Sequence, residues 1–314
     1  MKPLEGKVAV VAGATRGAGR GIARMLGEAG ATVYCTGRSS RLQANTSSHH
    51  HAGRPETIEE SAEMVDAAGG RGIAVRVDHA EEKEVAGLFR RVKREQKRLD
   101  ILVNVITGRP VKAWGPFWKS DVADGLDQLA GWLGPHAITI KHAAPLLIAG
   151  RSGLVVEIVE QHTLGHHGQA WFDFFEVALK RLAYVAAEEL APHGVAAVAI
   201  TPGFMRTEEI LEQFKVTEAN WRDAVNDPAP KSYGWAGSET PCFIGRAIVA
   251  LASDPEVMRK SGGLYSSWEL SEEYGFTDVD GERPHFWRYC EKEFPHLTNG
   301  RPATGRIWAV TAQP

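Results

Sequence analysis

Residues 8–19 read VAVVAGATRGAG, and this stretch decides the fold class of the chain. A run of five apolar residues predicts a buried β-strand, and the glycines that follow it predict a tight turn. The next segment, around residues 18–29, has the spacing of an amphipathic helix. A short apolar strand that passes through glycines into a helix indicates an alternating α/β fold.

The same alternation continues through the first 200 residues. Short runs rich in Val and Ile predict strands at 8–12, 32–36, 73–77, 101–105, 154–159 and 195–200. Amphipathic segments predict the helices between them, around 56–68, 81–98, 121–149 and 171–191. Strands that alternate with helices pair in parallel through right-handed crossovers, and strands that are apolar throughout are covered on both faces. We therefore predict an α/β fold with a doubly wound, Rossmann-like parallel sheet.

Composition excludes several classes of protein. Hydrophobic residues make up 43% of the 314 residues, which is enough for a full core. A formal net charge of −3 leaves no basic surface that would indicate a nucleic-acid partner. The three cysteines show no paired spacing, and no apolar run reaches 18 residues, so we expect neither a disulfide framework nor a membrane partner. The N-terminus has no signal-peptide pattern, and the expected location is cytoplasmic.

Residues 1–267 are predicted to form one domain. The polar loop 38–56 and the segment 203–240 follow strand ends, so both are expected to border the ligand-binding edge of the sheet. We expect two short helices in 203–240, as a substrate-loop insertion. A helix at 244–253 and a strand at 262–267 would complete the sheet. Residues 268–314 are predicted to be a C-terminal extension that packs on the domain or on a neighbouring subunit.

The glycine turn predicts a binding site for a dinucleotide. Gly13 permits the tight turn, while Gly17 and Gly19 let a pyrophosphate approach the amides at the helix N-terminus. The helix dipole favours negative charge at that point. Arg16, inside the turn, adds a positive charge.

The end of the second strand predicts which dinucleotide binds. A carboxylate there would accept hydrogen bonds from an adenosine ribose and repel a 2′-phosphate, but the sequence has Gly37 followed by Arg38. A guanidinium can bind phosphate through two hydrogen bonds. The predicted cofactor is therefore NADP, with residues 1–267 as its binding domain.

Four motifs in order carry a resemblance to the short-chain dehydrogenase/reductase (SDR) family. They are GATRGAG at 13–19, Val77-Asp78, Leu102-Val103-Asn104 and TPGFMRTE at 201–208. The resemblance runs from residue 6 to about residue 267. The stretches TVYCTGR and DVDGERP look like one subgroup of the family, in which the substrate is mostly unsettled.

The resemblance implies further cofactor-binding residues. Asp78 would contact the adenine amino group, and Asn104 would lie beside the adenosine ribose. Pro202 and Gly203 would shape the turn beside the nicotinamide, and Thr207 would contact its carboxamide. Val105 and Ile106 replace the residues that the family has after this asparagine, so the loop that they begin is expected to follow a different path.

The catalytic positions depart from the family pattern. The family uses a tyrosine as proton donor, a lysine four residues later and a serine thirteen residues before the tyrosine. Counting back from Pro202-Gly203, these places hold Phe172, Glu176 and Val159. None of the six tyrosines has a lysine four residues later, so another alignment does not restore the motif. A phenyl ring cannot donate a proton, and losing a positioned general acid costs about 10²–10⁴ in rate.

Other side chains are candidates for proton transfer. His162, His166 and His167 lie on the loop before the helix at 171–191, and histidine titrates near neutral pH. Glu176 is the fourth candidate, although Lys180 lies one helical turn beyond it and is expected to pair with it. We predict no metal site.

Aromatic residues are concentrated on the expected substrate side. They are Trp114, Trp118, Trp132, Trp171, Phe172, Phe174 and Phe175. Some must belong to the core, but their number favours a small aromatic or hydrophobic carbonyl or alcohol as substrate.

Three functions remain open from the sequence. The first is an NADP(H)-dependent SDR-family oxidoreductase with a non-standard proton transfer. The second is a non-redox enzyme of the same fold, such as a cyclase, isomerase or dehydratase, that keeps NADP. The third is an inactive subunit that partners an active relative. Since family members associate through helices such as those at 121–149 and 171–191, we expect a homodimer or homotetramer, or a hetero-oligomer with an active SDR.

Overall fold

A computed structural model gives the arrangement of the chain. It describes residues 2–43, 53–107, 116–160, 169–226 and 234–295. Seven parallel strands form one sheet in the order β3-β2-β1-β4-β5-β6-β7. Their bounds are β1 Val8–Ala12, β2 Thr32–Gly37, β3 Arg71–Arg76, β4 Ile101–Asn104, β5 Gly153–Ile158, β6 Val195–Thr201 and β7 Leu264–Ser266.

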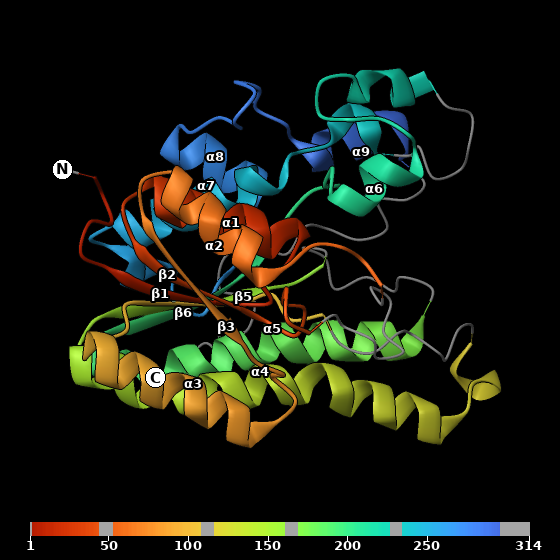
Figure 1. Cartoon of the computed structure of the whole chain (residues 1–314). Helices are drawn as coiled ribbons and strands as arrows, with labels where there is room; N and C mark the ends of the chain where they lie inside the picture. Colours follow the sequence, from red (N-terminus) through yellow and green to blue (C-terminus); the bar gives the residue numbers. More distant parts are fainter. Residues whose placement is uncertain (1, 44–52, 108–115, 161–168, 227–233, 296–314) are drawn as a thin grey trace, which may run out of the picture.

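Helices cover both faces of this sheet (Figure 1). One layer contains α1 Gly17–Glu28, α2 Ile58–Ala67 and α7 Pro241–Ser253, followed by α8 Ser267–Tyr274. The other layer contains α3 Glu82–Gln96, α4 Val122–Gly150 and α5 Ala170–Leu190. The predicted doubly wound α/β fold is therefore confirmed, and the strands that were expected from the sequence begin and end within a few residues of the observed ones. No helix in the described part of the chain is long and apolar enough to cross a lipid bilayer.

Alternation of side chains along each strand divides the core into two halves. In β1, Ala9 and Val11 pack with α1 and α7, whereas Val8 and Val10 pack with α3 and α4. Every residue of β1 and β6 is buried. Because both faces of these strands are covered, nearly all their side chains are apolar, and that made the strands recognisable in the sequence.

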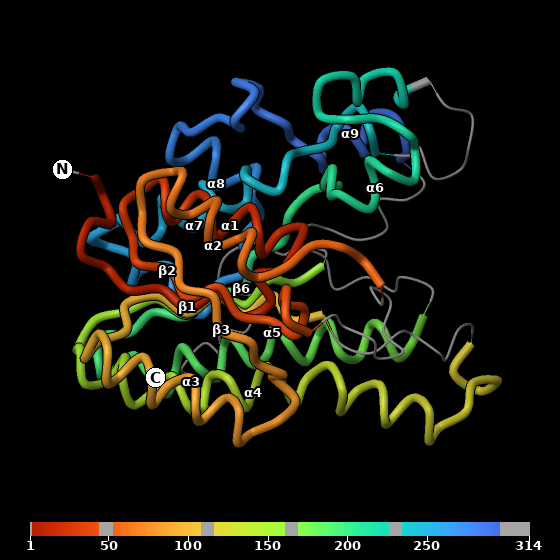
Figure 2. The backbone as a smooth tube through the Cα atoms, viewed as in Figure 1, coloured from red at the N-terminus to blue at the C-terminus, as the bar shows by residue number. Residues whose placement is uncertain are grey.

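Segments from both sides of α7 form a lobe beyond the carboxyl ends of the strands. The first contains α6 Glu208–Gln213 and two 3-10 helices, Trp221–Asn226 and Trp235–Gly237. The second ends in α9 Phe286–Glu293. Figure 2 shows α6 and α9 close together in this lobe, and α9 contacts the 3-10 helix at Trp235–Gly237. Within the C-terminal extension, α9 thus packs on the 203–240 segment of the same chain, whereas α8 contacts α7.

Candidate active site

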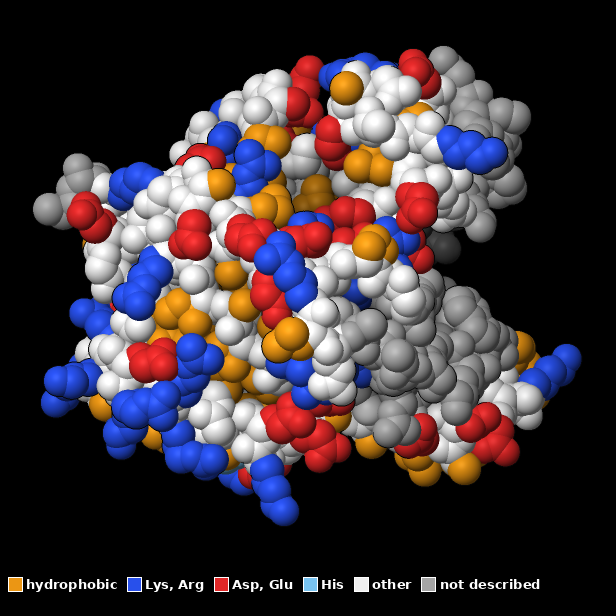
Figure 3. Space-filling model, in the orientation of Figure 1, with side chains coloured by type: hydrophobic (Ala, Val, Ile, Leu, Met, Phe, Trp, Pro, Cys, Tyr) orange, Lys and Arg blue, Asp and Glu red, His pale blue; other side chains and the backbone are white. Residues whose placement is uncertain are grey.

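A cleft of about 1270 Å³ lies at the carboxyl edge of the sheet. In Figure 3 the surface is hollowed between the lobe that carries α6 and α9 and the layer of α4 and α5. The cleft runs from the glycine turn and the end of β2, past β4 and β5, to α5 and the beginning of α6. In open α/β sheets this edge is where ligands bind.

The glycine turn has the geometry of a phosphate cradle. Gly13 has φ +96° and Gly17 has φ +52°, a left-handed conformation that favours glycine. A Cβ on Gly13 would collide with the carbonyl oxygen of Val105 on the neighbouring chain segment. A Cβ on Gly19 would collide with the carbonyl oxygen of Gly13, so Gly19 serves the close packing of the turn. Gly13 and Gly17 line the cleft, and the turn fits a nicotinamide dinucleotide.

Two arginines line the cleft at the end of β2. Arg38 is half-buried, and burial lowers the pKa of its guanidinium, while the carboxylate of Asp78 opposes that effect. Arg16 lies close enough to Arg38 to lower its pKa further. Arg16 also donates to the hydroxyl of Ser39, at 3.4 Å. Arg16 and Arg38, the two arginines that the sequence analysis proposed for the 2′-phosphate, therefore lie close together at the cleft surface.

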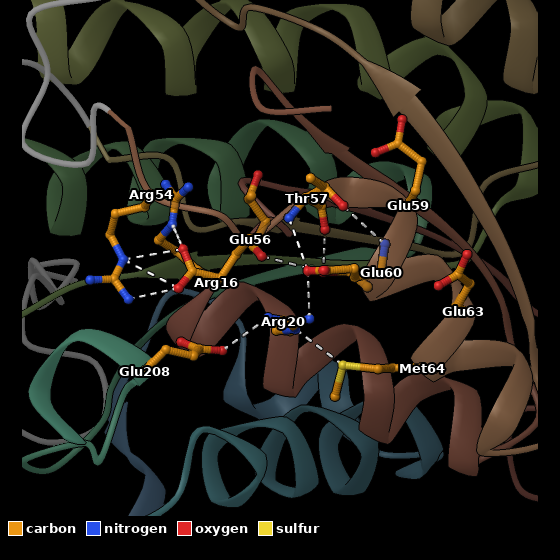
Figure 4. A network of polar contacts seen from close by, with 12 residues as sticks. Arg16, Arg20, Arg54, Glu56, Thr57, Glu59, Glu60, Glu63, Met64 and Glu208 are labelled. Atoms are coloured by element: carbon orange, nitrogen blue, oxygen red, sulfur yellow. Dashed lines mark hydrogen bonds and ion pairs between the residues drawn. The ribbon is translucent and has the colours of Figure 1, made fainter. Parts of the chain in front are cut away.

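The positive charge at this end is partly balanced by a buried carboxylate. Arg16 Nε lies 3.1 Å from Glu56 Oε2, and Arg54 Nη2 lies 2.7 Å from Glu56 Oε1. Figure 4 shows both guanidinium groups converging on Glu56, whose side chain is 7% exposed. The two guanidinium groups lower the pKa of Glu56 and outweigh the opposing effect of its burial. Glu56 therefore stays ionised, and it pairs with the cleft-lining Arg16 on one side and with Arg54 on the other.

The family-derived cofactor residues are placed at different depths. Asp78, Pro202 and Thr207 line the cleft. Gly203 lies behind the cleft wall, where its amide donates to Glu239 at 3.0 Å and a Cβ would meet Phe286 at 2.8 Å. Thr207 also accepts a hydrogen bond from the amide of Ile210 as the N-cap of α6. The structure thus brings part of the predicted set together at the cleft surface.

Asn104 lies behind the cleft surface, and its place beside the ribose stays a prediction. It is fully buried and is absent from the cleft lining, because its amide donates to Glu157 Oε1 at 2.6 Å. Asn104 on β4 and Glu157 on β5 are register partners in the sheet. Two polar residues inside otherwise apolar strands are the sequence signal for this contact.

Glu157 also holds a buried histidine of α4. His136 Nδ1 lies 2.5 Å from Glu157 Oε2, and its Nε2 lies 3.1 Å from the carbonyl oxygen of Ile106. Both ring nitrogens face acceptors, so both carry a proton and the ring is cationic. Burial lowers the pKa of His136, but the charge and hydrogen bond of Glu157 outweigh it and raise the pKa overall. His136 thereby holds the carbonyl group of Ile106, two residues after β4, and the only sequence signal for this ion pair was the polar residues themselves.

The three replaced catalytic positions all line the cleft. Val159 follows β5 and is buried, and Phe172 lies in the first turn of α5. The ring of Phe172 packs edge-on against Phe175, with centroids 4.9 Å apart. Neither Val159 nor Phe172 can exchange a proton.

Glu176 is the titratable member of that group. Its Oε2 accepts from the amide of Glu160 at 2.9 Å and from Lys180 Nζ at 3.3 Å, so the predicted pairing with Lys180 is confirmed. Both side chains are almost completely buried. Burial raises the pKa of Glu176 to about 8, although Lys180 opposes the shift, and burial lowers the pKa of Lys180. A cleft-lining carboxyl that titrates near neutral pH is suited to give and take a proton.

The three candidate histidines, His162, His166 and His167, lie outside the described residues.

The aromatic residues of the predicted substrate side separate into groups. Trp132 and Phe172 line the cleft, and Trp132 stacks on Phe175 at 4.4 Å. Trp118 and Phe174 are exposed on the outer surface, Trp171 is buried, and Trp114 is outside the described residues. The apolar lining near Glu176 therefore comes from few of the predicted rings. In the described ranges no three His, Cys, Asp or Glu side chains are placed to hold a metal ion.

Comparisons with known proteins agree with this fold. The family model described as Enoyl-(Acyl carrier protein) reductase matches residues 13–258. The chain is 34% identical over 293 residues to mouse Dehydrogenase/reductase SDR family member 1, covering 90% of this chain and 86% of the mouse protein.

Solved structures share the fold at lower identity. A metagenomic short-chain oxidoreductase in complex with NADP has a TM-score of 0.58 at 24% identity, with 81% of this chain and 93% of that chain covered. A short-chain dehydrogenase from Mycobacterium paratuberculosis bound to NAD has a TM-score of 0.63 at 20% identity, with coverages of 84% and 96%.

Fold and cleft together define a Rossmann-type protein of the oxidoreductase class. The chain belongs to the short-chain dehydrogenase/reductase family, and the mouse relative supports the subgroup to which TVYCTGR and DVDGERP pointed.

Proposed function

We propose that this chain is an NADP(H)-dependent oxidoreductase in which Glu176, paired with Lys180, transfers the proton. The observation that carries the proposal is one continuous cleft, with Arg16 and Arg38 lining one part and Glu176 lining another. The proposed substrate is a small carbonyl compound or alcohol with apolar surroundings, because Trp132, Phe172 and Leu179 line the cleft near Glu176.

The cofactor end supports NADP over NAD on electrostatic grounds. Arg16 and Arg38 both line this part of the cleft, so the 2′-phosphate of NADP would find two guanidinium groups there, and a guanidinium can bind phosphate through two hydrogen bonds. NADPH, when bound, supplies a hydride, which leaves the matching proton to the protein. Since the same fold in other proteins holds NADP or NAD, these side chains, and not the fold, must decide the choice.

Glu176 would supply the proton in the reducing direction. A carbonyl carbon that gains a hydride gains two electrons, and its oxygen then needs one proton. The carboxylic acid of Glu176 donates it and is left as a carboxylate. Lys180 Nζ and the amide of Glu160 are already placed to stabilise that negative charge. In the oxidising direction the same carboxylate accepts the proton of the alcohol.

The test of this function is cofactor binding by calorimetry. We expect NADP⁺ to bind at least about tenfold more tightly than NAD⁺, because Arg38 and Arg16 recognise the additional phosphate. Arg38→Ala should weaken NADP⁺ binding by about tenfold to a hundredfold and leave NAD⁺ binding nearly unchanged. The control substitution is Arg259→Ala. Arg259 is exposed, is paired with Glu256 and does not line the cleft, so its removal should leave the binding of both cofactors unchanged. Equal affinities for the two cofactors in the unaltered protein would contradict the proposal.

A second candidate function is a non-catalytic subunit that pairs with an active relative. Its support is a row of exposed apolar side chains on α4 and α5: Val122, Leu126, Phe174, Val177 and Val185. Such a face would be covered in a homodimer, a homotetramer or a hetero-oligomer with an active SDR. Sedimentation of the purified chain, alone and with an SDR that has the family's tyrosine and lysine, separates the cases. Association only with the second protein, without turnover by the chain itself, would favour this candidate.

A further inference from the structure

Helix α6 places a carboxylate on the glycine turn. Glu208 Oε2 accepts a hydrogen bond of 2.8 Å from the amide of Gly17, the first residue of α1. Glu208 Oε1 lies 3.6 Å from Arg20 Nη1, one turn further along α1. Figure 4 shows Arg20 between Glu208 and Glu60. A residue 191 positions away in the sequence thus supplies the anion at the N-terminus of α1.

The N-terminus of α1 has no anion of its own. Its N-cap, Arg16, makes no side-chain capping bond, and its first turn contains no acidic residue. Helix N-termini favour negative charge, and the amide of Gly17 belongs to the turn that fits a pyrophosphate. Glu208 therefore occupies a position that the cofactor's phosphates also require.

A second carboxylate of α6 contacts the arginine group at the 2′-phosphate end. Arg54 Nη1 lies 2.7 Å from Glu212 Oε2, while the other side of the same guanidinium binds Glu56. Glu212 is 72% exposed, whereas Arg54 is only 17% exposed. Because Glu212 is exposed, its carboxylate can leave Arg54 and be replaced there by another anion without unfolding the site.

We propose that Glu208 and Glu212 are internal competitors of the cofactor. Glu208 stands in for the pyrophosphate on the Gly17 amide, and Glu212 adds negative charge to Arg54, which shares Glu56 with the cleft-lining Arg16. This inference rests on the proposed function, since it names determinants of affinity at the same cofactor site. Binding of NADP(H) displaces Glu208 and competes with the charge of Glu212, so the contact that holds α6 against the glycine turn is released when the cofactor enters.

The packing beside Gly17 explains why displacement is required. A Cβ on Gly17 would meet the Thr207 side chain at 3.4 Å, so the beginning of α6 lies directly against the turn. A phosphate placed on the Gly17 amide would lie next to the Glu208 carboxylate, and two like charges in contact repel each other. Removing the carboxylate should therefore increase affinity, which is the opposite of what a cofactor-binding side chain would do.

Calorimetry on substituted proteins tests the inference. Glu208→Ala should tighten the binding of both NADP⁺ and NAD⁺ by about fivefold to tenfold, because both contain the pyrophosphate. Glu212→Ala should tighten NADP⁺ binding by about twofold to fivefold and leave NAD⁺ binding unchanged, because only NADP⁺ has the 2′-phosphate. The control is Glu63→Gln, which removes from α2 the carboxylate of an exposed ion pair with Arg41 and should change neither dissociation constant.

Two further measurements keep the result interpretable. Glu208→Gln retains a hydrogen-bond acceptor but drops the charge, so it should also tighten binding, and it carries the test if Glu208→Ala does not fold. If the unaltered protein binds neither cofactor, the proposed function fails, and inorganic pyrophosphate then serves as the probe. Tighter pyrophosphate binding by Glu208→Ala supports the inference. Unchanged or weaker binding of every probe by the Glu208 variants would overturn it.

Discussion

The two ends of the cleft handle charge in opposite ways. At the end lined by Arg16 and Arg38, several charged groups are close together and partly open to solvent, so an ionic ligand can exchange with them. At the end lined by Phe172 and Glu176, the surroundings are apolar, and the hydrogen-bonded side chains of Glu176 and Lys180 are almost completely buried. Charge in the first region favours binding of a phosphate, whereas burial in the second moves a proton affinity toward neutral pH. One cleft can therefore suit phosphate binding where charges lie together near solvent, and proton exchange where a carboxyl group is buried.

The largest expected effect comes from a substitution that removes proton transfer and leaves cofactor binding intact. Glu176→Gln should lower the rate of carbonyl reduction by about 10²–10⁴, because an amide has no proton to give, and should leave NADP⁺ affinity within about twofold. Steady-state rates and calorimetry on the same preparation measure both. Glu189→Gln, an exposed position on the same helix, is the matched control. If Glu176→Gln reduces the carbonyl compound as fast as the unaltered protein, Glu176 is not the proton donor, and the candidates become His162, His166 and His167.

The buried ion pair between His136 and Glu157 tests how strongly the free energy of unfolding depends on the burial of a charged pair. His136→Ala should lower the free energy of unfolding by about 3–5 kcal/mol, because it leaves Glu157 buried and without its cation. His142→Ala, on the same helix, removes a histidine whose partner Glu82 is half exposed, and it should cost less than about 1 kcal/mol. Urea unfolding of the two variants gives the difference. Equal losses would show that the His136 pair is no more than a surface contact.

The smallest expected effect is the pH dependence of the reduction rate, which tests the buried end of the cleft at Glu176. The raised pKa of Glu176, about 8, means that the carboxyl holds its proton below that pH and loses it above. Reduction should therefore be fast below about pH 8 and fall about tenfold per unit above it, while oxidation should rise with pH up to the same point. Because Glu176 and Lys180 are coupled, the apparent value belongs to the pair. A profile of kcat/KM for each direction measures it, and a reduction rate that is flat from pH 7 to 10 would count against Glu176.

The sequence alone determined the sheet, its helices and the glycine turn. Short apolar strands and the 3.6-residue periodicity of helices are local patterns, so each can be recognised within a short stretch of sequence. It also predicted Arg16, Arg38 and the replacement of the tyrosine and lysine, because these depend on order and spacing along the chain. The pairing of Lys180 with Glu176 followed from helical spacing in the same way.

Tertiary structure alone decided the contacts between distant segments. Glu208 reaches Gly17 across 191 positions, and His136 reaches Glu157 from another layer of the fold. The same arrangement withdraws Asn104 from the cleft, where its place in a motif had suggested a contact with the ribose. The effect of a charge on its neighbours depends on the distance between them and on their burial, and the order of residues along the chain determines neither directly. The proton affinity of Glu176 and the anion on the glycine turn therefore exist only once the sheet has brought their elements together.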